Sequence, residues 1–387
     1  MLNKLIRKVE QGDSMFKIMP VFGTRPEAIK MAPLIKVLEE QEKIKVIATV
    51  TAQHREMLDQ VLDLFKINPA YDLEIMKPRQ SLTGITVEVL SKLEPIISRE
   101  NPDLVLVQGD TATTFAASLA AFYRRIPVGH VEAGLRTYNK YSPFPEEMNR
   151  KLTGCLADLH FAPTQTAKEA LRKEGVPLDR IVVTGNTVID ALLQTVDKSY
   201  IFQDEELNTL DFAKKKVILL TAHRRENLGV RMEHIFQAVR KIVDKNPGVE
   251  VVFPVHLNPL VQEAARQVLG GLEQVKLVPP LEYKAFTNLM DRCYLVLTDS
   301  GGLQEEAPAL RKPVLVLRDT TERPEAVTAG TVKLVGTDPE KIIAETTSLL
   351  VNSDLYWKMA AAVNPYGDGK AAERILQAIR YYFKLSS

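Results

Sequence analysis

Short apolar runs alternate with amphipathic stretches along most of the chain, a pattern typical of strands followed by helices. In the first half, the runs suited to strands buried on both faces are residues 16–22, 45–51, 104–108, 127–131, 159–163 and 181–184. Helical stretches at 26–40 and 113–123 follow two of them. Because strand and helix alternate, we predict a parallel sheet joined by right-handed crossovers.

The second half repeats this plan. Its apolar runs are residues 216–221, 250–254, 276–278, 293–298 and 314–317. Between the two halves, at 190–214, periodicity weakens and charge rises, as in a linker between domains. A chain of 387 residues is also too long for one typical core, so we predict two α/β domains. Residues 1–14 are polar and basic without the apolar middle of a signal peptide, and we expect a leader or mobile tail.

The stretch 293–310 is the most informative single segment. A predicted strand at 293–298 is broken by Asp-Ser-Gly-Gly, and a helix with two acidic residues in its first turns follows from Leu303. A glycine turn before a helix start leaves backbone N–H groups available to a phosphate. A plain loop between strand and helix has the same pattern, so this corner alone leaves both interpretations open.

Composition narrows the class of protein. A hydrophobic fraction of 45% and a charged fraction of 26% are ordinary for a soluble globular protein. A net charge of +1 gives no general attraction to nucleic acid or membrane, and no apolar run approaches the ~20 residues that span a bilayer. Cys155 and Cys293 match neither a metal site nor a disulfide framework, so we expect no metal, a core position for Cys155 and a reducing cytoplasm.

Chemically useful side chains follow the predicted strands. In open parallel sheets ligands bind beyond the carboxyl ends of the strands. The residues found there are Arg25, Asp110, Glu132, His223, Ser300 and Arg323. Neither a G-x-G-x-x-G fingerprint nor a P-loop is present, so phosphate would be held by the Gly301-Gly302 turn and by arginines. Carboxylates in the first half and cations in both indicate a nucleotide-sugar bound in a cleft between two domains.

Seven motifs in register resemble those of non-hydrolysing UDP-N-acetylglucosamine 2-epimerases of the bacterial type. They lie at residues 23–33, 108–114, 130–137, 145–150, 222–227, 299–306 and 318–325, and the resemblance extends from Met15 to the end. It implies a GT-B-like fold of two Rossmann-like domains with the active site between them. The first domain would be residues 15–188, completed by a C-terminal helix within 367–387, and the second, which binds UDP, residues 189–366. A homodimer is also implied.

The resemblance implies a reversible epimerisation at C2 of UDP-N-acetylglucosamine to UDP-N-acetylmannosamine, without an added cofactor. UDP leaves C1 and a proton leaves C2, a 2-acetamidoglucal forms, and UDP adds back. A sugar C2 proton is barely acidic, so a carboxylate must remove it as UDP departs. Catalytic roles are implied for Asp110, Glu132 and Glu146, and His223 would assist the leaving phosphate. Which carboxylate is base and which is acid stays open.

Simpler interpretations of these residues remain. Asp110 could cap the helix that begins near Thr111, and Glu132 and Glu146 could be solvated loop carboxylates. The resemblance also implies a set of substrate-binding residues: Arg25, Lys30, Leu281, Phe286, Ser300, Gly301, Gly302, Glu306 and Arg323. For its two apolar members, Leu281 and Phe286, packing in the core is an equal alternative. A second molecule of UDP-N-acetylglucosamine would act as allosteric activator, bound by Gln53, Arg79, Gln80, Glu146, Arg224 and His256. His160 and His234 carry no motif and are expected to be structural.

Two other functions compete with the epimerase. A glycosyltransferase on the GT-B plan would use the same UDP-sugar, but it has no C2 proton to remove and no need of a carboxylate cluster. A catalytically silent nucleotide-sugar sensor would not need Asp110, Glu132, Glu146 and His223 together. By resemblance alone, the product would supply N-acetylmannosamine for a cell-surface polysaccharide.

Overall fold

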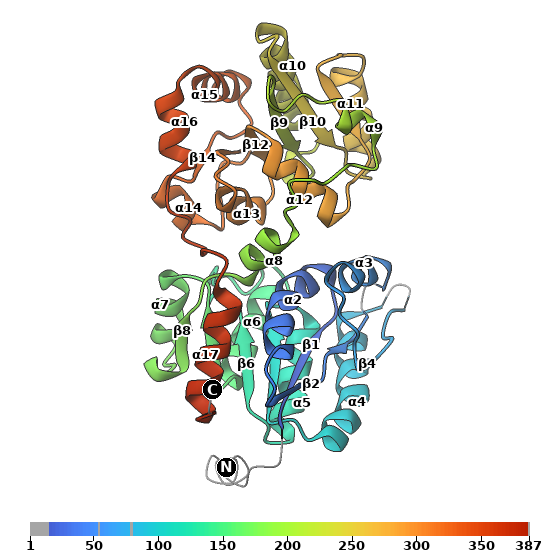
Figure 1. The fold of residues 1–387 in the computed structure, drawn as a ribbon, viewed down its shortest axis with the longest axis vertical. Helices are drawn as coiled ribbons and strands as arrows, with labels where there is room; N and C mark the ends of the chain where they lie inside the picture. Colours follow the sequence, from blue (N-terminus) through green and yellow to red (C-terminus); the bar gives the residue numbers. More distant parts are fainter. Residues whose placement is uncertain (1–14, 53–54, 78–79, 386–387) are drawn as a thin grey trace. The chain divides into compact units, whose positions relative to one another are not determined.

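The computed structural model describes residues 15–52, 55–77 and 80–385. The described chain divides into two compact units (Figure 1). The first comprises the described residues up to Ala191 and from Tyr366 onward, and the second is Leu192–Pro365. Each unit is built on one parallel sheet with helices between its strands, which confirms the predicted α/β class with two parallel sheets.

The sheet of the first unit has the order β4-β3-β1-β5-β6-β7-β8, with β2 also paired to β1. Its strands are β1 Phe16–Phe22, β2 Ile44–Val46, β3 Thr49–Val50, β4 Tyr71–Asp72, β5 Leu104–Gln108, β6 Val128–Val131, β7 Leu159–Ala162 and β8 Ile181–Val183. Pairing is parallel throughout, so the carboxyl ends of β1, β5 and β6 lie next to one another at one edge. The candidate catalytic residues of the first half follow these strands.

The helices of the first unit are α2 Arg25–Glu39, α3 Arg55–Phe65, α4 Leu82–Glu100, α5 Ala112–Tyr123, α6 Glu146–Leu156, α7 Gln165–Lys173, α8 Thr187–Thr195 and α17 Ala371–Phe383, with a 3-10 turn at Leu178–Arg180. Helix α2 begins where it does because Thr24 and Glu27 form a capping box. Alanines on the buried face of α5 allow it to pack closely on α4. The division between the units falls within α8.

The last helix belongs to the first unit. Helix α17 packs against α2 (Figure 1), and the ring of Phe383 lies 4.9 Å from that of Phe16 in β1. Arg380 Nη2 also donates to Gln41 Oε1 at 2.7 Å. Tyr366, the first residue of the C-terminal part of this unit, is buried. Its carbonyl accepts from the backbone N–H of Asn186 at 2.7 Å. The first described strand and the last helix therefore share one core.

The sheet of the second unit has the order β11-β10-β9-β12-β13-β14, all parallel. Its strands are β9 Lys216–Thr221, β10 Val249–Pro254, β11 Val275–Val278, β12 Leu295–Thr298, β13 Val314–Val316 and β14 Val332–Leu334. Its helices are α9 Glu205–Asn208, α10 Val230–Lys245, α11 Pro259–Leu269, α12 Tyr283–Arg292, α13 Leu303–Ala309, α14 Pro324–Ala329, α15 Pro339–Val351 and α16 Ser353–Ala360, with a 3-10 turn at Arg225–Asn227.

Some local predictions were wrong. The run 45–51 forms two short strands, β2 and β3, that pair with different parts of β1. The run from Cys293 becomes a strand only at Leu295, because Cys293 caps the end of α12. Cys155 is exposed on α6 instead of lying in the core. Residues 1–14, for which we expected a leader, lie outside the described part of the chain.

Candidate active site

Glu132 lies directly after β6, and its buried carboxylate accepts from three side chains. Lys30 Nζ lies 2.7 Å from Oε1 and 2.6 Å from Oε2. Asn186 Nδ2 donates to Oε1 at 3.0 Å, and Gln108 Nε2 donates to Oε2. Glu132 has a left-handed backbone, with φ at +64°, an uncommon conformation for a residue with a side chain. A solvated loop carboxylate would have none of these features, so that interpretation of Glu132 was wrong.

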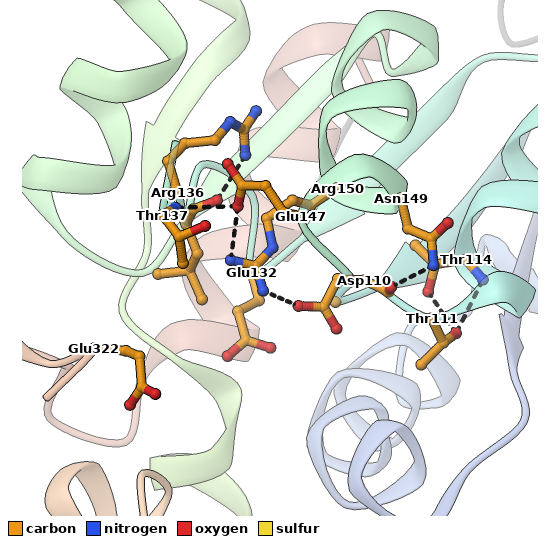
Figure 2. Close-up of polar contacts among 12 residues, drawn as sticks. Asp110, Thr111, Thr114, Glu132, Arg136, Thr137, Glu147, Asn149, Arg150 and Glu322 are labelled. Carbon is orange, nitrogen blue, oxygen red and sulfur yellow. Dashed lines mark hydrogen bonds and ion pairs between the residues drawn. The ribbon is translucent and has the colours of Figure 1, made fainter. Parts of the chain in front are cut away.

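Asp110 follows β5 on the neighbouring strand, and its carboxylate faces helix α6. Its Oδ2 forms an ion pair with Nη2 of Arg150, and Asn149 Nδ2 donates to its backbone carbonyl at 2.9 Å (Figure 2). The residue that caps α5 is Thr111, whose hydroxyl accepts from the N–H of Thr114 at 3.1 Å. The interpretation of Asp110 as the helix cap was therefore wrong.

Glu146 is the first residue of α6, and Glu147 follows it. One carboxylate oxygen of Glu146, Oε2, is buried and has no hydrogen-bond partner within the described residues. Glu147 is only 1% exposed and accepts from the backbone N–H groups of Thr137 and Tyr138, at 3.0 Å each. Glu146 Oε2 therefore lacks a partner among the described residues, whereas Glu147 fixes the loop that follows Glu132.

Arg25 and Lys30 both lie on α2, and the buried Glu27 sets the start of that helix. Its carboxylate accepts from the backbone N–H groups of Gly23 and Thr24 and from the hydroxyl of Thr111, at 3.0, 2.7 and 2.6 Å. Burial raises the pKa of Glu27, and these hydrogen bonds oppose the rise. Glu27 thus joins the loop before α2 to the loop that carries Asp110.

Two buried histidines support this edge of the sheet. His130 in β6 donates from Nε2 to the carbonyl of Gly109 at 2.7 Å, which requires the proton on that nitrogen. Burial lowers the pKa of His130 to about 3 and that of its neighbour on β7, His160, to about 4. Both rings are therefore neutral near pH 7, and His160 lies inside the sheet core, as a structural histidine would.

In the second unit, Asp299 organises the loops after β9 and β12. Asp299 is fully buried, and its Oδ2 accepts from the backbone N–H groups of His223 and Arg224, at 2.9 and 2.8 Å. Asn227 Nδ2 donates to the same oxygen at 3.1 Å. The His223 ring stacks on His256, with centroids 5.2 Å apart, and its Nε2 lies 4.0 Å from Asp299 Oδ1. Burial lowers the pKa of His223, whereas the charge of Asp299 opposes that fall.

The turn at 300–302 lies beside a group of arginine ion pairs. A Cβ added at Gly301 would lie 3.7 Å from Arg224 Nη2, so a side chain there would narrow the space at the turn. Arg323 forms an ion pair with Glu305, and Arg318 is paired with Glu226. The same Cβ would lie 4.0 Å from Glu322 Oε2, and the backbone N–H of Ser300 donates to the Thr298 hydroxyl at 2.9 Å. Phosphate binding at this turn stays a prediction. The other predicted substrate residues of this unit, all half-buried, are Leu281, Phe286, Ser300 and Glu306.

Comparisons with known proteins identify the family. The family model described as UDP-N-acetylglucosamine 2-epimerase matches residues 36–380. The chain belongs to this family. It is 58% identical over 368 residues to the UDP-N-acetylglucosamine 2-epimerase of Bacillus subtilis, covering 95% of this chain and 96% of that protein. The Escherichia coli enzyme of the same name is 55% identical over 371 residues, covering 94% and 98%.

A solved structure of the family has the same fold. The UDP-GlcNAc 2-epimerase from Neisseria meningitidis, bound to UDP-GlcNAc, superposes with a TM-score of 0.84 at 52% identity. The superposition covers 95% of this chain and 100% of that one. Family membership and the GT-B-like fold were therefore predicted correctly from the sequence motifs.

The residues predicted for an activator fall in three places. Gln53 and Arg79 lie outside the described residues. Gln80 and Glu146 belong to the first unit, and the side-chain nitrogen of Gln80 is buried without a hydrogen-bond partner among the described residues. Arg224 and His256 belong to the second unit, where the backbone N–H of Asn258 donates to His256 Nδ1 at 3.0 Å. His256 therefore carries its proton on Nε2 when neutral.

Sequence reasoning missed several residues that hold the candidate catalytic groups. Four of them lie inside the seven motifs, but the motifs did not indicate their roles. These four are Glu27, Glu147, Asn149 and Arg150. Asn186 lies outside all seven motifs and was missed entirely. Among the described residues, no group of three or more His, Cys, Asp or Glu side chains could hold a metal ion, and no helix is long and apolar enough to cross a membrane.

Proposed function

We propose that the protein interconverts UDP-N-acetylglucosamine and UDP-N-acetylmannosamine by elimination and re-addition of UDP. The observation that carries this proposal is the carboxylate set at the carboxyl ends of β5 and β6 and the start of α6. Asp110 and Glu132 are held by ion pairs, and Glu146 has a buried oxygen without a partner in the described chain. Carboxylates at these positions suit proton removal and return at a carbon.

In the forward direction a carboxylate of this set takes the C2 proton. The electron pair of the C2–H bond forms the C1=C2 double bond of 2-acetamidoglucal, and UDP leaves C1 with the electron pair of the C1–O bond. A proton delivered to the other face of C2, with return of UDP to C1, gives the epimer. The carboxylates are regenerated, so the cycle needs no oxidant or reductant.

The second unit would hold UDP. Negative charge grows on the β-phosphate as the C1–O bond breaks, and donors aimed at that charge stabilise it. His223 would donate to the phosphate, and the 300–302 turn with Arg323 would bind the diphosphate. Arg25, on α2 of the first unit, is the remaining residue proposed for the diphosphate. Glu306 would accept from the ribose hydroxyls, and Leu281 and Phe286 would contact uracil. This arrangement accounts for the absence of a dinucleotide fingerprint.

Three further properties are proposed from the resemblance to the family. The same sugar nucleotide would act as an allosteric activator through Gln80, Glu146, Arg224 and His256, with Gln53 and Arg79. The enzyme would be a cytoplasmic homodimer without nucleic-acid or membrane partners, and its product would supply a cell-surface polysaccharide. Neither a GT-B glycosyltransferase nor a sensor explains the carboxylates of Asp110, Glu132 and Glu146, because neither moves a proton at C2.

Isotope exchange during turnover tests the elimination. In D₂O, the product should carry deuterium at C2, because carboxylate protons exchange rapidly with solvent. Oxygen-18 placed in the C1–O bridge should move into non-bridging β-phosphate positions, because elimination severs that bond and UDP can rotate before returning. Deuterium entry with the bridge label fixed would contradict elimination and favour a C3-ketone route. Failure to form UDP-N-acetylmannosamine at all would favour the transferase or the sensor.

A further inference from the structure

Arg150 joins two carboxylates at the carboxyl edge of the first sheet. Its Nη2 forms an ion pair with Oδ2 of Asp110, and its Nη1 lies 3.4 Å from Oε2 of Glu147 (Figure 2). The side chains of Arg150 and Glu147 are only 12% and 1% exposed. The Asp110 side chain is 30% exposed. Salt and water therefore screen the Arg150–Glu147 pair much less than a surface pair, and they screen the Arg150–Asp110 pair more than the first.

Glu147 is itself fixed to the backbone. Both of its oxygens accept from N–H groups of the loop after Glu132, those of Thr137 and Tyr138. Arg150 is thus anchored at one end to a rigid carboxylate and presents its other donor to Asp110. A guanidinium can do this because its donors lie in a fixed planar fork, whereas a lysine ammonium is a point charge on a flexible stem.

The backbone of Asp110 is held by the same helix. Asn149, the neighbour of Arg150 on α6, donates from Nδ2 to the Asp110 carbonyl at 2.9 Å. Helix α6 therefore holds Asp110 by both its main chain and its side chain. Because Glu146 is the first residue of α6, this helix also sets the spacing between two of the candidate catalytic carboxylates.

We propose that Arg150 and Glu147 are positioning residues that hold Asp110 in place for proton transfer at C2. This inference rests on the proposed function, in which Asp110 belongs to the carboxylate set. A general base must lie within hydrogen-bond reach of the proton it moves, and a displacement of about 1 Å can cost about 100-fold in rate. Glu147 acts on Asp110 only through Arg150.

The alternative is an ion pair that only stabilises the fold. Such a pair would change the melting temperature and leave kcat unchanged in the molecules that remain folded. The positioning role instead requires that kcat falls while the affinity for UDP, which the second unit would bind, stays the same. It also requires that the loss of kcat depends on the Asp110 carboxylate.

The first experiment compares Arg150→Met and Arg150→Lys in the full chain. We expect kcat of Arg150→Met to fall about 10- to 100-fold, with UDP affinity by calorimetry within about twofold of the original. Arg150→Lys should fall less, because one ammonium keeps the charge but cannot hold Asp110 and Glu147 in the same geometry. Exogenous guanidinium should partly restore kcat of Arg150→Ala and have no effect on Arg150→Met, whose side chain fills the site.

Lys17→Met is the matched control. Lys17 is a partly buried cation at the start of β1, where its ammonium donates to the carbonyl of Glu100 at 2.8 Å and pairs with the carboxylate at 3.7 Å. It lies at the amino end of the same sheet, away from the candidate catalytic residues. This variant should lose stability and keep kcat within about twofold of the original. An equal loss of kcat in Lys17→Met and Arg150→Met would overturn the positioning role.

A double-mutant cycle then links Arg150 to Asp110. If Arg150 acts through the Asp110 carboxylate, Asp110→Asn and Asp110→Asn with Arg150→Met should have equal residual kcat. Full additivity of the two losses would overturn the inference. Glu147→Gln should also lower kcat, because the amide nitrogen of glutamine would place N–H donors against a backbone N–H. Unchanged kcat in Glu147→Gln would show that Glu147 does not position Asp110.

The cycle separates this inference from the proposed function. Near-normal turnover in Asp110→Asn would remove Asp110 from the mechanism and end both. An inactive Asp110→Asn with a fully active, cooperatively melting Arg150→Met would end the positioning role alone. If Arg150→Met does not fold, Arg150→Lys decides the question. Normal kcat in Arg150→Lys would end the positioning role, and reduced kcat with unchanged UDP affinity would support it.

Discussion

Lys30 Nζ lies within 2.7 Å of both carboxylate oxygens of Glu132, a residue 102 positions further along the chain. The pair joins the first turns of α2 to the loop after β6. Its side chains are 21% and 5% exposed, so the charges are largely removed from water. Such a pair is weakly screened by salt, and loss of one partner leaves the other charge uncompensated.

Lys30→Met should therefore destabilise the fold and lower turnover. We expect a loss of about 1–3 kcal/mol in the free energy of unfolding, because Glu132 would keep a buried charge without its cation. Urea unfolding measures this loss, and a progress curve for UDP-N-acetylmannosamine measures kcat. Adding Glu132→Gln should recover most of the stability and none of the activity.

Lys36→Met on the same helix is the control for Lys30→Met. Lys36 pairs with Glu39 at 3.0 Å, and the two side chains are 34% and 40% exposed. Exposed pairs of this kind contribute about 0–1 kcal/mol. If Lys30→Met unfolds at the same urea concentration as Lys36→Met, the Lys30–Glu132 pair does not have the energetic weight that its burial implies.

Asn186 should matter through its amide nitrogen. Asn186→Asp would place a carboxylate about 3 Å from Glu132, where like charges repel strongly in a buried site. We expect Asn186→Asp to lower kcat and stability more than Asn186→Ala, which only removes the donor. Asn352→Asp, at the cap of α16, is the control, since aspartate caps a helix equally well. A ranking with alanine worse than aspartate would mean that packing, not the Glu132 contact, dominates at this position.

The alternation of strands and helices predicted the two sheets because each strand is buried on both faces and reads as an apolar run. The division of 45–51 into β2 and β3 was not predictable, since Ile47 and Ala48 are as apolar and buried as the strand residues beside them. The division depends on which residues form backbone hydrogen bonds with β1, and that pairing is a tertiary contact that local sequence does not encode.

The candidate site shows the same limit. Asp110 and Thr111 are adjacent, and both residue types favour helix caps, so local propensity cannot choose between them. Thr111 is the cap because the Asp110 carboxylate is paired with Arg150, 40 positions later. Motifs therefore indicate which residues carry the chemistry, whereas the residues that hold them, such as Asn186, are recognised only once distant segments are brought together.

His130 and His160 should make the fold sensitive to mild acid. Their pKa values in the folded protein, about 3 and about 4, lie below the ordinary value of 6.5. Between the folded and the ordinary pKa of each histidine, the unfolded chain therefore binds more protons than the folded protein. Stability should then be fully present above pH 6.5 and fall as the pH drops toward 4, by about 1.4 kcal/mol per pH unit for each histidine. Urea titrations at pH 7, 6 and 5 measure this slope. His160→Gln should reduce it by about half, and an unchanged slope would assign the acid sensitivity to other groups.

An activator site predicts a particular kinetic pattern. The rate against UDP-N-acetylglucosamine should be sigmoidal, and the reverse reaction should stall unless a trace of that sugar nucleotide is present. Arg79→Ala should weaken activation more than substrate binding, since coupling energies between sites are about 1–3 kcal/mol. Hyperbolic kinetics in both directions would count against the second site.

Asp299→Asn tests how the second unit prepares His223. The amide oxygen can replace Oδ2 and keep the hydrogen bonds from the backbone of His223 and Arg224, so the loop should stay in place. The amide nitrogen would then occupy the position of Oδ1, which is buried without a hydrogen-bond partner within the described chain, at a cost of about 1–3 kcal/mol.

The charge of Asp299 is the part of its role that this variant removes. In the original protein that charge raises the pKa of His223 against the larger lowering caused by burial. Without it, the pKa of His223 should fall further, so the ring should hold its proton only at lower pH. NMR titration of the six histidines, with His223→Gln to assign the signal, measures the shift directly. We expect lower kcat near pH 7 with UDP affinity nearly retained, because a histidine with a lower pKa is protonated in a smaller fraction of the molecules, and only the protonated ring can deliver a proton to the departing β-phosphate. A His223 signal that titrates at the same or higher pH in Asp299→Asn would show that Asp299 orients the loop and has no electrostatic effect on the ring.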